Sequence, residues 1–346
     1  MRILVLRFSA MGDVALLVPV LHQLQKAHPK AEITVVSQPF LAPLFKSLRL
    51  EFFAADVKKE YSGFGGLGRL ARLLKKRVKP DVVVDVHAVL RTHILKVHFR
   101  AMGVKVVQLQ KDRAGRKALT AYPNKTLKPL RHSAENYCQT FAKAGFTIPF
   151  SKEDRPQLHY PLESAPKKYW LEERNSLNLG IAPFAQHQAK SWPLAKMEKL
   201  LQALTYPNLK LWFFGGPQEA EALQALGQSS GKAFTVVAGR FALDQEIALM
   251  QNLQAFVAMD SGNMHLASLA GVPVVSIWGG THPYAGFAPL GQKPEWQVQL
   301  REKELDCRPC SAFGAKPCFR GDYACLQQLG HERVLATLSS VIKEYL

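Results

Sequence analysis

A strand, a polar turn, a short helix and a second strand follow one another within residues 256–280, and this run constrains the fold most. The apolar strand that begins at Phe256 ends at Asp260, a Ser-Gly-Asn turn follows, and the predicted helix stops at Gly271. A helix that starts where a parallel strand ends carries unpaired backbone N–H groups and about half a positive charge. The run therefore predicts a βαβ unit that can hold nucleotide phosphates, with an ordinary ligand-free turn as the plainer alternative.

The second strand of this run ends in Gly279 and Gly280. Because glycine has no Cβ, a pair of glycines at a strand end lets another group come close to the backbone. We expect that group to be a bulky ligand.

The chain has 346 residues, enough for two domains that each have a core. Its content of 47% hydrophobic and 21% charged residues is normal for a folded protein. No apolar run is long enough to cross a bilayer, and the first strand lacks the apolar core of a signal peptide. We therefore expect a cytoplasmic protein.

Predicted strands and helices alternate in both halves of the chain, which indicates a parallel α/β architecture. The run 81–87 contains three consecutive valines at 82–84, a continuous apolar stretch that is typical of a strand covered on both faces. The predicted fold class is α/β, with two doubly wound, Rossmann-like domains facing across a cleft. The predicted parts are residues 1–160, a proline-bearing linker 161–178, residues 179–330, and a helix 331–346 that packs back toward the first domain. Two long loops are expected, a glycine-rich one at 62–68 and a basic one at 111–131.

The formal charge of +18 is concentrated in the first half of the chain. Residues 1–160 contain 28 Lys and Arg against 11 Asp and Glu, whereas residues 161–346 contain 17 against 16. This asymmetry indicates an anionic partner for the first half, although solvated lysines without a specific role are a common alternative.

Five short motifs follow one another along the chain in an order and with a spacing that resemble those of one protein family. They are Ser9 to Asp13, Lys190 to Pro193, Gly215 to Glu219, Asp260 to Ala267, and Trp278 to Pro283. The chain resembles, over nearly its whole length, the ADP-heptose:lipopolysaccharide heptosyltransferases of glycosyltransferase family 9. The resemblance implies a GT-B fold whose first domain binds the acceptor and whose second binds the nucleotide-sugar donor. It also implies inverting transfer that requires no metal or other cofactor.

By this resemblance Asp13 is the base that takes the proton from the acceptor hydroxyl as its oxygen attacks the anomeric carbon. The alternative is that Asp13 only caps its helix. Lys190 matches the lysine that meets the negative charge developing on the leaving diphosphate. Residues 185–189 depart from the family, because the hydroxyl residues often found before this lysine are replaced by Ala-Gln-His-Gln-Ala.

The resemblance assigns further donor contacts. Glu219 falls where the family binds the donor's ribose with a carboxylate, although it also suits a helix cap. Asp260, Ser261 and Gly262 form the donor turn, and Asp260 is expected to order its amides. His265 faces the sugar or the phosphate, or else packs inside the protein.

Arg91 matches a position that faces the acceptor. An anionic lipid A–core acceptor suits the positive charge of the first half. The basic segments 69–79 and 111–131 predict peripheral contact with the anionic inner membrane.

Four cysteines lie within nineteen residues, at Cys307, Cys310, Cys318 and Cys325. A Cys-x-x-Cys pair followed by two more cysteines is compatible with a structural zinc site, although the second pair is more widely spaced than usual. A disulfide is less expected in a cytosolic protein.

Four alternatives remain open on the sequence. The same fold serves sugar-nucleotide epimerases and transferases with other donors, and a relative that has lost its activity would keep the fold too. A basic nucleic-acid-binding protein is less expected, because the basic half shows no zinc finger, aromatic-rich signature or dimerisation heptad.

Overall fold

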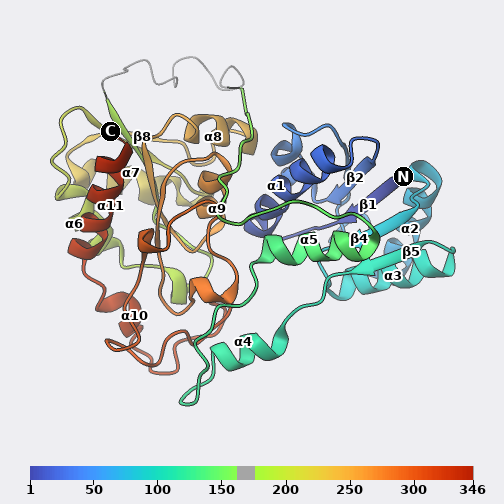
Figure 1. The fold of residues 1–346 in the computed structure, drawn as a ribbon. Coiled ribbons are helices and arrows are strands. Elements are labelled where there is room, and N and C mark those ends of the chain that lie inside the picture. The colour runs from blue at the N-terminus through green and yellow to red at the C-terminus, as the bar shows by residue number, and fades with distance from the viewer. Residues whose placement is uncertain (162–175, 346) are drawn as a thin grey trace. The chain divides into compact units, whose positions relative to one another are not determined.

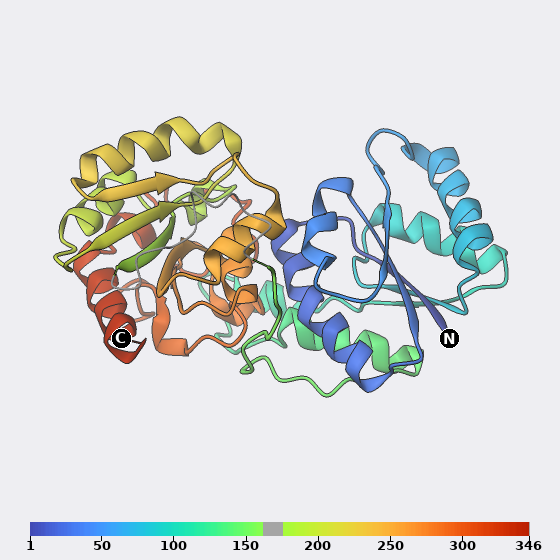
Figure 2. The ribbon, with the colours of Figure 1, turned by 90° about the horizontal axis from the view of Figure 1, so that it is seen from above.

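A computed structural model describes residues 1–161 and 176–345 and divides the chain into two compact units (Figure 1). The first unit comprises Met1–Asp112 and His132–Lys152, and the second comprises Arg113–Arg131 and Glu153–Leu346. Each unit contains one parallel sheet covered by helices, as the alternation of strands and helices predicts (Figures 1 and 2).

The first unit has a five-stranded parallel sheet in the order β3-β2-β1-β4-β5. Its strands are β1 (Arg2–Leu6), β2 (Glu32–Ser37), β3 (Glu51–Ala54), β4 (Val82–Asp85) and β5 (Lys105–Gln108). Its helices are α1 (Met11–Ala27), η1 (Pro39–Phe45), α2 (Gly63–Val78), α3 (Leu90–Ala101) and α5 (Ser133–Ala144). The strand order reverses direction at β1, so α1 and α5 pack together on one face of the sheet and α2 and α3 on the other.

The central strands are buried on both faces, which is why they are continuous apolar runs. Leu4 and Leu6 of β1 and Val83 of β4 are fully buried in the core beneath α2 and α3. Ile3 and Val5 of β1 are fully buried as well, and neighbouring side chains of a strand point to opposite faces.

Two features of this unit differ from the prediction. The glycine-rich segment expected as a loop forms the first two turns of α2. Two of its glycines allow neighbouring parts of the chain to pack closely against the helix, which explains why glycine occurs there. A Cβ at Gly66 would lie 2.6 Å from the backbone carbon of Tyr61, and one at Gly68 would lie 3.0 Å from the ring of His98. Helix α3 was not predicted, since Leu90 and Val97 point to solvent and obscure its amphipathic pattern.

The second unit has a six-stranded parallel sheet in the order β11-β10-β9-β6-β7-β8. Its strands are β6 (Leu177–Ala182), β7 (Leu209–Phe213), β8 (Ala233–Val236), β9 (Ala255–Met259), β10 (Val274–Ile277) and β11 (Gln297–Val298). Its longer helices are α4 (Arg113–Leu119), α6 (Leu194–Gln202), α7 (Ala220–Ser230), α8 (Leu243–Met250), α9 (Gly262–Leu269) and α11 (His331–Tyr345). Its short helices are η4 (Gln188–Lys190), η5 (Pro217–Glu219), η6 (Pro283–Ala285), η7 (Pro294–Trp296) and α10 (Ala324–Gln327).

Two predicted boundaries differ in the structure. The basic segment 113–131 begins with α4 and belongs to the second unit, where the backbone N–H of Leu130 donates to the carbonyl of Tyr284 at 2.9 Å. The predicted linker 161–178 lies largely outside the described residues, and its last two residues already belong to β6.

The C-terminal helix also differs from the prediction, which placed it toward the first domain. Val334, Leu338, Val341 and Ile342 of α11 are buried in the core of the second unit, and α11 packs on α6, β9 and β10. Its apolar stripe is therefore satisfied inside the second unit. Within the described part of the chain, no helix combines the length and the apolar character that a membrane span requires.

Candidate functional site

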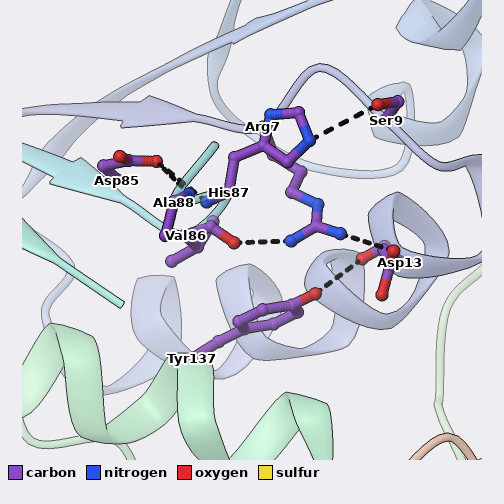
Figure 3. A network of polar contacts seen from close by, with 8 residues as sticks. All are labelled: Arg7, Ser9, Asp13, Asp85, Val86, His87, Ala88 and Tyr137. Carbon is purple, nitrogen blue, oxygen red and sulfur yellow. Dashed lines mark hydrogen bonds and ion pairs between the residues drawn. The ribbon is translucent and has the colours of Figure 1, made fainter. Parts of the chain in front are cut away.

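The candidate base Asp13 is held by a buried arginine (Figure 3). Arg7 follows β1, and Asp13 is the third residue of α1. The two side chains form an ion pair with 2.5 Å between Arg7 Nη2 and Asp13 Oδ2. The Arg7 side chain is only 7% exposed, whereas that of Asp13 is 26% exposed. The carboxylate is thus supported from inside the protein and still reaches solvent.

The guanidinium of Arg7 stays charged in this setting. Burial acts to lower the pKa of Arg7, but the carboxylate of Asp13 and the neighbouring Tyr137 and Asp85 act to raise it, and the pKa is raised overall. Arg7 Nη1 also donates to the carbonyl of Val86 at 2.6 Å. Both terminal nitrogens are therefore engaged, which fixes the direction of the guanidinium.

Tyr137 of α5 supports the same pair from the other side (Figure 3). Its ring lies under the Arg7 guanidinium, 5.7 Å from ring centroid to Cζ, and its hydroxyl donates to the backbone carbonyl of Asp13 at 3.3 Å. The ring is almost fully buried. It contributes a cation–π contact and restrains the first turn of α1.

A second polar turn follows β4 beside this pair. Asp85 is fully buried, and its Oδ1 accepts from the backbone N–H groups of His87 at 2.9 Å and Ala88 at 3.0 Å. Its Oδ2 accepts from Gln108 Nε2 at 2.6 Å. Ala88 has a φ of 51°, in the left-handed region, and the Asp85 carboxylate holds the backbone there.

This turn brings His87 against the loop that precedes α1. His87 Nε2 lies 3.4 Å from Ser9 Oγ, and Nδ1 is buried without a hydrogen-bond partner among the described residues. Burial, together with the positive charges of Arg7, Lys111 and Arg91, lowers the pKa of His87 to about 3. His87 is therefore neutral at physiological pH. The predicted acceptor residue Arg91 is exposed in the first turn of α3, near enough to influence this histidine.

The predicted phosphate lysine of the second unit lies in a buried ion pair. Lys190 Nζ is 2.9 Å from Asp260 Oδ2, and the two side chains are 16% and 6% exposed. Thr281 Oγ1 donates to the same carboxylate oxygen at 2.7 Å. Lys190 ends η4, Asp260 follows β9, and Thr281 follows β10, so three segments distant in sequence meet here.

The start of α9 lies next to this pair. Ser261 is its N-cap residue, yet the Ser261 hydroxyl makes no cap bond and is buried without a partner in the described part of the chain. Gly262 opens the helix, and His265, one turn later, is 7% exposed. This helix start offers backbone N–H groups and a hydroxyl to an anion, beside the ammonium of Lys190.

The prediction for Gly279 and Gly280 was wrong. A Cβ at Gly279 would lie 2.6 Å from the side chain of Leu326 and 2.7 Å from the carbonyl oxygen of Ala189. The backbone N–H of Gly280 donates to that carbonyl at 2.8 Å. The two glycines therefore let the chain itself approach, and they place the segment that ends in Lys190 against the end of β10.

Glu219 makes the contact of a helix cap. Its Oε2 accepts from the backbone N–H of Gly216 at 2.7 Å, and a Cβ at Gly215 would lie 2.5 Å from the same oxygen. The carboxylate is thus folded back on its own turn. The structure shows the capping alternative directly, while the ribose contact stays a prediction.

Arg308 holds the loop after β10 and had no counterpart in the sequence analysis. It is 3% exposed, and it donates to the carbonyls of Gly279 at 3.0 Å, Thr281 at 2.8 Å and Leu300 at 2.7 Å. Burial lowers its pKa to about 10, so it remains a cation at neutral pH. Its only sequence signal is its position inside the Cys-x-x-Cys segment.

The four clustered cysteines are free thiols. Cys307 and Cys325 are buried in the core of the second unit, and Cys310 and Cys318 are partly exposed. Across residues 1–161 and 176–345, no three His, Cys, Asp or Glu side chains are placed to hold a metal ion. Cys307 and Cys325 pack as apolar core residues, and a structural zinc site stays a prediction.

Comparison with known proteins agrees with this geometry. A family model described as glycosyltransferase family 9 (heptosyltransferase) matches residues 45–312, well over half of the chain. The chain belongs to glycosyltransferase family 9. As a family 9 protein it is a glycosyltransferase, which confirms the predicted family and enzyme class.

Individual relatives of this family 9 protein are distant in sequence but match over most of their lengths. It is 26% identical to lipooligosaccharide heptosyltransferase 2 of Haemophilus influenzae, over 88% of this chain and 90% of that protein. The crystal structure of the glycosyl transferase family 9 from Veillonella parvula has a TM-score of 0.75 at 22% identity, over 99% of this chain and 97% of that one.

The ADP-heptose lps heptosyltransferase II of E. coli has a TM-score of 0.70 at 19% identity, over 99% of both chains. With the two parallel sheets, these structural matches confirm the predicted GT-B fold class.

Proposed function

We propose that this protein transfers heptose from ADP-heptose to the inner core of lipopolysaccharide, with inversion at the anomeric carbon. The observation that carries the proposal is the partly exposed carboxylate of Asp13, held by the buried guanidinium of Arg7. It is supported by membership of the heptosyltransferase family and by a fold neighbour whose name includes ADP-heptose.

In the proposed reaction, Asp13 accepts the proton of an acceptor hydroxyl while the hydroxyl oxygen attacks the anomeric carbon of the heptose. The new bond forms on the face opposite the leaving group, so the configuration inverts. The carbon–oxygen bond to ADP breaks, and ADP departs with the electron pair. Arg7 keeps the carboxylate oriented and is a positioning residue, since it is buried behind Asp13.

The second unit binds the leaving group in this proposal. The ammonium of Lys190 and the first amides of α9 meet the charge that develops on the diphosphate. In the structure that ammonium is held by Asp260, which Thr281 also contacts. Asp260 therefore places Lys190 ready for the donor, and Ser261 offers its hydroxyl to the same phosphates. His265, Gly262 and Glu219 complete the proposed donor contacts.

We propose that this chemistry needs no metal ion or other cofactor, because lysine and helix amides supply the positive charge that a metal would otherwise provide. We also propose that the acceptor is an anionic lipid A–core molecule contacted by Arg91, and that the enzyme works in the cytoplasm at the inner membrane, without nucleic acid. The basic character of the first half supports an anionic partner.

The test is transfer itself. The purified protein is incubated with ADP-heptose and a panel of lipid A–core acceptors, with and without a chelator, and product is detected by mass. We expect one acceptor to gain a single heptose at a rate that the chelator does not change. Absence of transfer to every acceptor would refute the proposed reaction, and loss of transfer with the chelator would refute metal independence.

Another nucleotide sugar is the second candidate for the donor, because residues 185–189 lack the hydroxyl residues often present in the family. A parallel incubation with other ADP- and UDP-sugars distinguishes the two. Transfer from one of these in preference to ADP-heptose would favour the alternative, and conversion of the sugar nucleotide without acceptor would indicate an epimerase.

A further inference from the structure

Helices α2 and α3 form a layer of one charge sign on the first unit. They pack against each other on the same face of the sheet (Figure 2). Together they contain eight Lys and Arg and no Asp or Glu. Their inward side is apolar and buried, with Leu70 and Leu74 of α2 and Leu95 and Phe99 of α3 in the core. The charge is therefore carried on the side that faces solvent.

The outward stripe of α2 combines basic and apolar side chains. Arg69, Arg72, Leu73 and Lys76 are spaced i, i+3, i+4 and i+7, so they share one face of the helix. All four are exposed, and 41% of Leu73 is accessible to solvent.

The outward stripe of α3 repeats this composition. Leu90, His93, Val97 and Arg100 lie on one face of the helix and are all exposed. The accessible fractions of Leu90 and Val97 are 75% and 58%. Phe64 at the start of α2 adds a third large apolar group, 62% exposed, with its ring 4.8 Å from that of His98 on α3. We call these stripes and Phe64 the α2–α3 face.

We propose that the α2–α3 face binds the surface of an anionic lipid bilayer. Basic side chains interleaved with exposed Leu, Val and Phe fit a partner that is anionic at its surface and apolar just beneath it. A nucleic acid would neutralise the charges but leave the aliphatic side chains in water. Charge complementarity and apolar exposure together therefore favour a bilayer.

The position of the α2–α3 face gives it a role in presenting the acceptor, and this role rests on the proposed function. Helix α3 begins three residues after His87, and Arg91 is in its first turn. The bilayer contact thus adjoins the turn that packs against the loop leading to Asp13. An acceptor anchored in the same bilayer by its acyl chains would be presented beside the base.

Flotation of the full-length protein with vesicles tests the inference. We expect binding to vesicles of phosphatidylglycerol and phosphatidylethanolamine at low salt, and little binding to vesicles of phosphatidylcholine. Arg72→Gln with Lys76→Gln should weaken binding about 25-fold, because each basic residue near an anionic surface contributes about fivefold in affinity.

The matched control is Lys26→Gln with Lys30→Gln, which removes the same charge from exposed sites at and just beyond the end of α1, on the other side of the sheet. It should change binding by less than about twofold. Leu73→Ser with Val97→Ser keeps the charge and should remove the part of the binding that persists at high salt. All these side chains are exposed, and thermal melts by circular dichroism check that each variant folds.

Equal binding by the α2–α3 variants and the control would overturn the inference. So would a shift of RNA by the wild-type protein with no vesicle binding. Heptose transfer to an acceptor dispersed in detergent is measured in parallel. Heptose transfer without vesicle binding would refute membrane binding by the α2–α3 face but not the proposed reaction. Vesicle binding that depends on the α2–α3 face, without heptose transfer, would refute the proposed reaction but not membrane binding by the face.

Discussion

The Nη2 atom of Arg7 lies 2.5 Å from Oδ2 of Asp13, in an ion pair that is buried on the arginine side and open on the aspartate side (Figure 3). Only the partner nearer solvent can meet a substrate. The arginine, which also bonds the carbonyl of Val86, serves to hold the carboxylate in place. This division of roles gives separate predictions for the two residues.

Replacing Asp13 by Asn should remove the base while keeping the shape of the side chain. We expect kcat to fall by about a thousandfold, within the usual range for loss of a general base. The affinity for ADP, measured by calorimetry, should stay the same, because the proposed donor contacts lie in the second unit. Turnover close to that of the wild type would exclude Asp13 as the base.

Replacing Arg7 by Met should leave the Asp13 carboxylate without its buried cation. Breaking such a pair costs about 3 kcal/mol of folding stability, so the melting temperature should fall. In addition, kcat should drop more than KM changes, because the base loses its orientation. Arg7→Lys keeps the charge but not the two-pronged geometry and should restore part of kcat. Equal kcat in Arg7→Lys and Arg7→Met would argue against positioning.

Replacing Lys190 by Gln should weaken ADP binding at least about tenfold, through loss of a charged phosphate contact. The variant should also be less stable by about 3 kcal/mol, because Asp260 is only 6% exposed and would lose its cation. Lys199→Gln, at an exposed position on α6, is the matched control and should change neither quantity. If both variants bind ADP alike, Lys190 does not contact the diphosphate.

Glu246 on α8 gives a prediction about pH. It is 6% exposed, and burial raises its pKa from an ordinary 4.5 to about 8. Between these values the folded protein binds a proton that the unfolded chain has released. The free energy of unfolding should therefore fall as pH rises, by up to about 1.4 kcal/mol per pH unit from this group.

Glu246→Gln cannot titrate, so its melting temperature should depend less on pH and should exceed that of the wild type by an amount that grows between about pH 4.5 and pH 8. Glu221→Gln, at an exposed site on α7, is the control and should follow the wild-type curve. Melts across this pH range compare the three proteins, and identical curves for all of them would contradict the burial argument.

The sequence by itself determined the class of the fold and the family. Apolar runs such as Val82–Asp85 and a glycine-bearing helix start at Gly262 are local signals, because the spacing of residues along one segment decides which side chains share a face. Asp13 and Lys190 were likewise identified from short motifs. The helix α3 escaped this reasoning, since two of its large apolar residues face solvent.

Only the tertiary structure decided which of these residues meet. Arg7 joins Asp13, Lys190 joins Asp260, and the glycines after β10 admit Ala189 in place of a ligand. The α2–α3 face likewise exists only once two helices have packed on one side of a sheet. The physical reason is that ion pairs and close backbone approaches depend on distances between remote segments, which packing of the whole core sets and no local spacing records.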